Sequence, residues 1–232
     1  MATKKAVNGS GNLDGATFNY TLSASFPLLM HFDNILADDE SAARGKDPGG
    51  KAGDDRHPAD KWKQYLYADE ENKYVAMPFN NIMAALRYVG SKIPMPRPVV
   101  NLKILSQVGI QLLEPFAEFT VGGRRVAMAD IEGIGGTFAD QVAQARDLGF
   151  SLDVRGVSVN GKRHVRVRPR FADWKVRGTF MVMDPVFNAQ LLTKLWDLAG
   201  KMAGLGDWRP GCSGRQRIPG PYGRFTVELE QT

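Results

Sequence analysis

Basic side chains recur at every second position in one stretch of this chain, at His164, Arg166, Arg168 and Arg170. Successive side chains of a strand point to opposite faces, so these four residues are expected to share one face of a sheet. Like charges this close repel one another unless an anion neutralises them, and each guanidinium is a planar fork of donors that suits phosphate. The spacing therefore predicts a phosphate-binding strand, continued on the next strand by Lys175 and Arg177. A solvated basic face, or a face paired with acids elsewhere in the chain, is the alternative.

A glycine-rich segment follows between residues 200 and 225. Glycines let a backbone approach a ligand closely, and here they are Gly204, Gly206, Gly211, Gly214, Gly220 and Gly223. Positive charge comes from Arg209, Arg215, Arg217 and Arg224, while Trp208 and Tyr222 are candidates for stacking on bases. The segment follows a predicted helix and lacks the fingerprints of nucleotide-binding phosphate loops. It is predicted to contact a phosphate backbone, and a structural turn with its arginines in solvent is the alternative.

Other residues give little indication of catalysis. The three histidines, His31, His57 and His164, have no metal-ligand spacing, and the single Cys212 has no local base. No nucleophile elbow is present. The aromatic residues Trp174, Phe180, Phe187 and Trp196 have the spacing of core residues. The sequence therefore predicts a protein that is not an enzyme and that needs no metal or cofactor.

Composition sets the broad class. The chain has 232 residues, a formal net charge of +5 and one cysteine. A disulfide framework and a cysteine-rich zinc site are excluded, and the basic excess favours polyanionic partners. The N-terminal stretch has no apolar signal region, and no apolar run approaches the length of a membrane span. A cytoplasmic protein with no membrane partner is expected.

Periodicity and turn signals predict an α+β fold. Strands are expected at 17–26, 99–119, 151–159, 162–170, 174–183 and 224–230, and helices at 78–90, 138–148 and 186–202. Asn160-Gly161 joins two of these strands as a hairpin. Without insertions at about 33–72 and 94–150, the order is that of a ferredoxin-like (RRM-like) βαββαβ core. We expect a flexible leader over 1–15, a single domain over 16–232, and the arginine strand in the same sheet as the final strand.

The C-terminal part resembles a known superfamily. Gly204-Leu205-Gly206 and Gly223-Arg224-Phe225-Thr226-Val227 look like the RAMP superfamily, with the Cas7-like backbone subunits of CRISPR effector complexes nearest in shape. The tract Arg166–Phe171, Trp174 at the start of the next strand and the turn Gly206–Pro210 also look similar to small proteins of phages and prophages. The resemblance implies an RRM-like fold, a single-stranded nucleic-acid ligand, oligomers or a filament along it, and a glycine loop that touches phosphates. In some members an Asp after the first strand cuts RNA, and Asp33 is placed loosely like it.

Three hypotheses follow from these observations. The leading one is a single-stranded nucleic-acid-binding protein, for RNA or DNA, that coats the backbone as a homo-oligomer. The second is a phage structural or assembly protein whose basic face binds a neighbouring subunit, using acids from residues 33–71. The third is a metal-dependent ribonuclease that uses Asp33.

Overall fold

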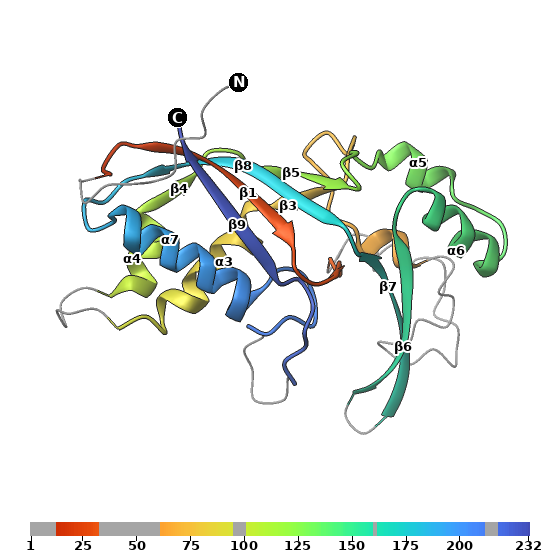
Figure 1. Cartoon of the computed structure of the whole chain (residues 1–232). Coiled ribbons are helices and arrows are strands. Elements are labelled where there is room, and N and C mark those ends of the chain that lie inside the picture. The colour runs from red at the N-terminus through yellow and green to blue at the C-terminus, as the bar shows by residue number, and fades with distance from the viewer. Residues whose placement is uncertain (1–12, 33–60, 95–100, 160–161, 212–217) are drawn as a thin grey trace.

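The computed structural model describes residues 13–32, 61–94, 101–159, 162–211 and 218–232, and the side chains of 157–164 fall outside this description. A large antiparallel sheet has helices packed under one of its faces, and a long hairpin extends away from it (Figure 1). The mixed helices and antiparallel strands confirm the predicted α+β class.

The first predicted strand lies inside the large sheet. β1 (Thr17–Ala24) pairs with β8 (Trp174–Val182) on one edge and with β9 (Phe225–Gln231) on the other. β8 also pairs with β5 (Phe116–Val121) and with β4 (Ile110–Leu112), and β3 (Ala76–Pro78) adds to β5. The order β3-β5-β8-β1-β9 is antiparallel at every pairing between the described strands.

Helices cover one face of this sheet because its strands alternate. Phe18, Tyr20 and Leu22 of β1 are buried, whereas Asn19 between them is exposed. The helices on that side are α3 (Phe79–Gly90), α4 (Leu102–Val108), α7 (Ala189–Leu198) and the π-helical turn η2 (Ala199–Ala203) (Figure 1). Tyr20 stacks on Trp196 of α7 with ring centroids 5.2 Å apart, and burial raises its pKa above the ordinary value.

The arginine strand belongs to a second sheet. β7 (Lys162–Phe171) pairs with β6 (Ser151–Val159) and with the short β2 (Leu28–Leu29). The prediction that this strand shares a sheet with the final strand is therefore wrong. Both edges of β8 are already occupied, by β1 and by β4 and β5, so β7 has no place beside the strand that follows it.

The two sheets share one core. Buried Phe119 of β5 makes ring contacts with buried Phe171 of β7 and with buried Trp174 of β8. Around this junction lie the 3-10 helix η1 (Trp62–Tyr65), α5 (Met128–Gly133) and α6 (Phe138–Asp147). Trp62 Nε1 donates to Gln141 Oε1 at 2.8 Å, which ties η1 to α6. The hairpin root is thus fixed to the large sheet by aromatic packing.

Part of the predicted leader packs on the domain. Leu13 is buried and the backbone N–H of Gly15 donates to Val182 O at 2.8 Å. The chain is therefore attached to the end of β8 before β1 begins.

A substitution at Gly223, just before β9, can test how closely the glycine segment is packed. Its φ is +70°, and a Cβ there would overlap the carbonyl oxygen of Leu205. We expect Gly223→Ala to lower the free energy of unfolding by about 2 kcal/mol or more, measured by urea denaturation. Gly123→Ala is the control because Gly123 has φ +82° but nothing within 4 Å of the added Cβ. Its cost should stay near the ~1 kcal/mol of the backbone term; equal losses in the two variants would contradict the packing argument.

Candidate functional site

The hairpin register places several charged residues on one face. Arg155 of β6 lies opposite Arg166, Asp153 opposite Arg168, and Ser151 opposite Arg170. Directly opposed residues of an antiparallel pair project to the same side of the sheet. The predicted arginine face therefore exists, and it spans two strands. We call the side chains of Ser151, Asp153, Arg155, Arg166, Arg168 and Arg170 the hairpin face.

Arg168 is held inside the molecule. Its side chain is 6 % exposed, and its Nε lies 2.7 Å from Oδ2 of Asp207 in the glycine segment. The N–H of Asp207 donates to Leu29 O of β2 at 2.8 Å, so this carboxylate is fixed at the edge of the small sheet. A buried guanidinium needs such a partner because an unpaired buried charge is strongly destabilising. Arg168 therefore anchors the glycine segment to the hairpin face.

Arg155 forms a second anchor beside the first. Its Nε lies 2.8 Å from Asp153, and its guanidinium donates to the hydroxyl of Tyr222. The same guanidinium lies 4.9 Å from the ring centroid of Trp208 and 5.3 Å from that of Tyr222. Cation–π contacts of this kind stabilise partly desolvated sites. The sequence did not single out Arg155, although the pairing around Asn160-Gly161 fixes it opposite Arg166.

The two aromatic residues predicted to stack on bases stack on each other. The Trp208 and Tyr222 ring centroids are 5.6 Å apart with planes 28° from parallel, and the edge of Phe26 meets Tyr222. Tyr222 is buried, whereas Trp208 is half-buried and has a positive φ of 46°. Stacking of a base on either ring stays a prediction, and Trp208 has the more accessible ring.

The glycines of this segment permit contact with the chain's own backbone. A Cβ at Gly206 would overlap Leu29 O, and one at Gly220 would overlap Trp208 O. The N–H groups of Gly204, Gly211 and Gly223 donate to Ala199 O, Ala203 O and Pro27 O. These amides already have acceptors inside the protein. Contact between Gly204, Gly206, Gly211, Gly220 or Gly223 and a phosphate stays a prediction.

Three cations near these anchors have no acidic partner within the described residues. Arg166 and Arg170 flank buried Arg168 on β7 and are both partly exposed. Arg170 makes only a 3.5 Å hydrogen bond to the Ser151 hydroxyl. Arg209 donates to Gly206 O at 2.7 Å and is also partly exposed. Their remaining donors are available to an external anion.

Lys175, Arg177 and Arg224 lie elsewhere. Lys175 and Arg177 are exposed and alternate with buried residues of β8, so they project from the uncovered face of the large sheet. On that face Arg177 lies opposite Glu118 and Thr21, and Thr21 lies opposite Glu228. Arg177 Nη1 lies 3.7 Å from Glu118 Oε1. Arg224 is exposed just before β9. Lys175 and Arg177, two predicted site residues, therefore lie on a different sheet from the hairpin face. Glu118 and Glu228 also reduce the net positive charge of the surface around Arg177.

Some predicted site residues lie outside the described residues, namely Arg215, Arg217, Gly214 and Asp33. Within the parts of the chain that the structure describes, no group of three His, Cys, Asp or Glu side chains is placed to hold a metal ion. None of the described helices is long and apolar enough to cross a membrane. Comparison of the chain with models of known protein families and with curated proteins finds no match.

The Arg168–Asp207 ion pair should be essential to the packing of the glycine segment. Asp207→Ala leaves a buried guanidinium without its carboxylate, and we expect the free energy of unfolding to fall by about 2–3 kcal/mol. Glu118→Ala removes the exposed partner of Arg177 and should change it by less than about 0.5 kcal/mol. Chemical denaturation of both variants measures the difference. Equal, small effects would show that Arg168 does not depend on Asp207.

Proposed function

We propose that this protein binds single-stranded nucleic acid through the hairpin face and coats it as an oligomer. The observation that carries the proposal is the excess of positive charge where the hairpin and the glycine segment meet. Arg155, Arg166, Arg168, Arg170 and Arg209 gather there, and among the described residues the acids that pair with them are Asp153 and Asp207. Phosphate is an anion that guanidinium forks bind in a bidentate geometry.

The fold supports a ferredoxin-like core of the kind that the resemblance to the RAMP superfamily implies. In chain order β1, α3, β5, β8, α7 and β9 follow the βαββαβ pattern, and the short β4 pairs with β8 as β5 does. The spatial order β9-β1-β8-β5 puts the first and third of these strands at the centre. β3, η1, α4, α5, α6 and the hairpin are then additions to that core.

The uncovered face of the large sheet is a less suitable site for single strands. RNA-recognition modules stack bases on aromatic residues of their two central strands. Here the corresponding positions on β1 and β8 are held by Asn19, Thr21, Arg177 and Thr179. These positions hold no aromatic residue, and Glu118 and Glu228 lie on the same face. The hairpin face is therefore the better candidate for the binding surface.

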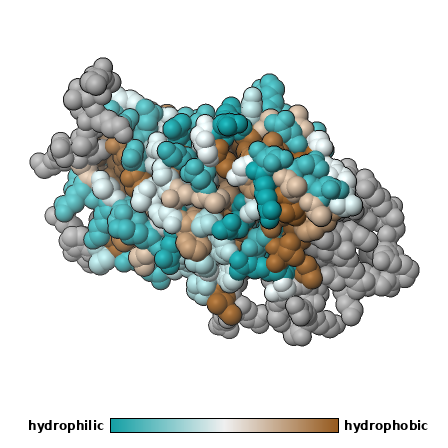
Figure 2. Space-filling model, turned by 45° about the vertical axis from the view of Figure 1, so that its right-hand side comes forward, coloured by the Kyte–Doolittle hydropathy of each residue, from teal (hydrophilic) through white to brown (hydrophobic). Residues whose placement is uncertain are grey.

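Two strand edges support assembly along a ligand. β6 and β9 end their sheets, so each has an edge that no other described strand covers. Such edges are templates for pairing with another chain. On the side of the hairpin opposite the arginines, Val154 is 51 % and Val165 is 38 % exposed. Figure 2, in which the right-hand side of Figure 1 comes forward, shows hydrophobic side chains among hydrophilic ones on that part of the surface. A neighbouring copy of the protein could cover this apolar surface.

The binding test uses 12-nucleotide oligomers of uridine and of thymidine, measured by fluorescence anisotropy over a series of salt concentrations. We expect log affinity to fall linearly with log salt concentration. The double variant Arg166→Gln/Arg170→Gln should reduce the magnitude of this slope by about 1.4, because each phosphate contact on a single strand contributes about 0.7.

The control variant removes the same charge from exposed helix positions. Lys103→Gln/Lys194→Gln changes α4 and α7, where both lysines are exposed. Its slope should equal that of the unmodified protein. Absence of binding at low salt, or equal slopes in all three proteins, would contradict the proposal. Protein oligomers that persist after nuclease treatment and carry no nucleic acid would instead support the assembly-protein hypothesis.

A further inference from the structure

A cavity lies at the root of the hairpin, away from the hairpin face. It measures about 330 Å³ and is lined by three segments that are distant in the sequence. These are the turn and strand end around Val121–Val126 with Asp130 of α5, the end of α6 with Leu148 and Gly149, and Asp173 in the turn between β7 and β8. Its size is at the lower end of the range for small-ligand sites, which suits a single planar ring system.

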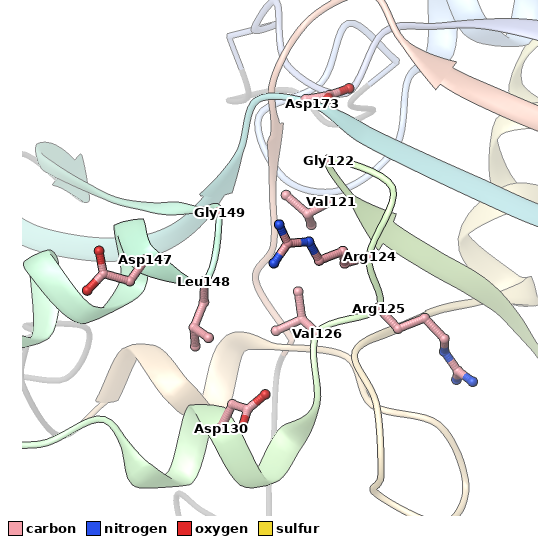
Figure 3. Close-up of a pocket in the computed structure, with 10 residues that line it drawn as sticks. All are labelled: Val121, Gly122, Arg124, Arg125, Val126, Asp130, Asp147, Leu148, Gly149 and Asp173. Atoms are coloured by element: carbon pink, nitrogen blue, oxygen red, sulfur yellow. The ribbon is translucent and has the colours of Figure 1, made fainter.

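Arg124 is directed into this cavity. Figure 3 shows its guanidinium over the central space, facing Leu148 and Gly149. Val126 and the carboxylate of Asp130 lie below it, and Asp147 and Asp173 lie at the rim. Arg124 forms no ion pair with any described residue, and the same is true of Asp130. The neighbouring Arg125 points away from the cavity, where it lies over the Tyr74 ring and 3.4 Å from Asp69.

The backbone of Arg124 is held in a tight turn, while its side chain is exposed. Val121 and Arg124 exchange two backbone hydrogen bonds, of 2.8 and 3.0 Å, which close a tight turn through Gly122 and Gly123. The N–H of Gly122 donates to Asp173 O at 3.0 Å, so the turn is fixed to the β7–β8 connection. On the opposite wall, Gly149 has φ +91° and packs against Val121, which brings the end of α6 close.

The lining groups select the ligand by its edges. A simple cation would meet Arg124, and a simple anion would meet the carboxylate of Asp130, while Asp147 and Asp173 add negative charge at the rim. The ligand must therefore present acceptors on one edge and donors on another, with apolar faces against Val121, Val126 and Leu148. Guanine does this: its O6 and N7 accept from an arginine fork, and its N1–H and N2–H₂ can donate to a carboxylate. Adenine is unsuited because its N6–H₂ donor would face the guanidinium.

We propose that this cavity holds one unstacked guanine base, with Arg124 on its acceptor edge and Asp130 on its donor edge. The inference rests on the proposed function, because the base would belong to the bound single strand. Sequence-specific recognition of single strands commonly reads such splayed bases on their edges. The cavity and the hairpin face are linked through the chain, because Asp173 of the cavity rim comes three residues after Arg170 of the hairpin face.

The first test compares two oligomers, a 12-nucleotide uridine strand and the same strand with one central guanosine, by fluorescence anisotropy. The guanosine should tighten binding about 10-fold, which corresponds to one bidentate contact. Arg124→Gln and Asp130→Asn should each abolish this gain and leave uridine binding unchanged. Arg125→Gln should keep the gain. A gain that survives Arg124→Gln, or one of equal size when adenosine replaces guanosine, overturns the inference.

A second measurement separates this inference from the proposed function. Saturation-transfer NMR with free guanosine and free adenosine reports on the cavity even if neither oligomer binds. Signal from guanosine that is lost in Arg124→Gln and kept in Arg125→Gln supports the cavity site independently of strand binding. Uridine binding with no guanosine signal and no gain from guanosine in the strand rejects the cavity site while the proposed function stands. No oligomer binding at low salt rejects the proposed function.

Discussion

The ion pair between the buried guanidinium of Arg168 and the half-buried carboxylate of Asp207 is the contact on which the C-terminal architecture depends. It joins the small sheet to the glycine segment, and the N–H of Asp207 extends the connection to Leu29 of β2. Around it, Arg155 binds Asp153 and covers Trp208 and Tyr222. The arginine-rich hairpin is stable because the charges of Arg155 and Arg168 are neutralised by carboxylates of the same chain. The partly exposed Arg166 and Arg170 are the ones left for an external anion.

Local signals predicted much of the secondary structure. Pro78 and Gly90 mark the limits of α3, and β6 pairs with β7 up to Val159 and Lys162, on either side of Asn160-Gly161, which lies outside the described residues. The alternation of Phe18, Tyr20 and Leu22 gave the buried face of β1. These features depend on residues close together in the sequence, where capping, turn preference and periodicity act. The short helices α4 and α5 were not predicted, because six or seven residues give too few turns for a periodic pattern.

Contacts between distant segments were beyond such reasoning. No local sequence pattern indicates that β7 pairs with Leu28 and Leu29 in the small sheet, whereas β8, the next strand in the chain, belongs to the large sheet. The glycine content predicts a surface for ligand phosphates, yet Gly206 and Gly223 are required where the chain passes its own carbonyl groups. No local pattern marks Arg124 and Asp130, because their significance comes from the cavity that they share with Leu148 and Asp173. The sequence shows the charge and type of each residue, but it does not show which distant residues come into contact in the fold.

The central claim is that the charge left on the hairpin face binds the backbone of a nucleic acid. The most direct measurement is the ratio of absorbance at 260 and 280 nm of protein purified at low salt, followed by sizing of any bound material with RNase and DNase. The account predicts a ratio raised by co-purified nucleic acid, with fragments that one nuclease removes and that high salt releases. A ratio of protein alone at low salt, with no fragments recovered, would contradict it.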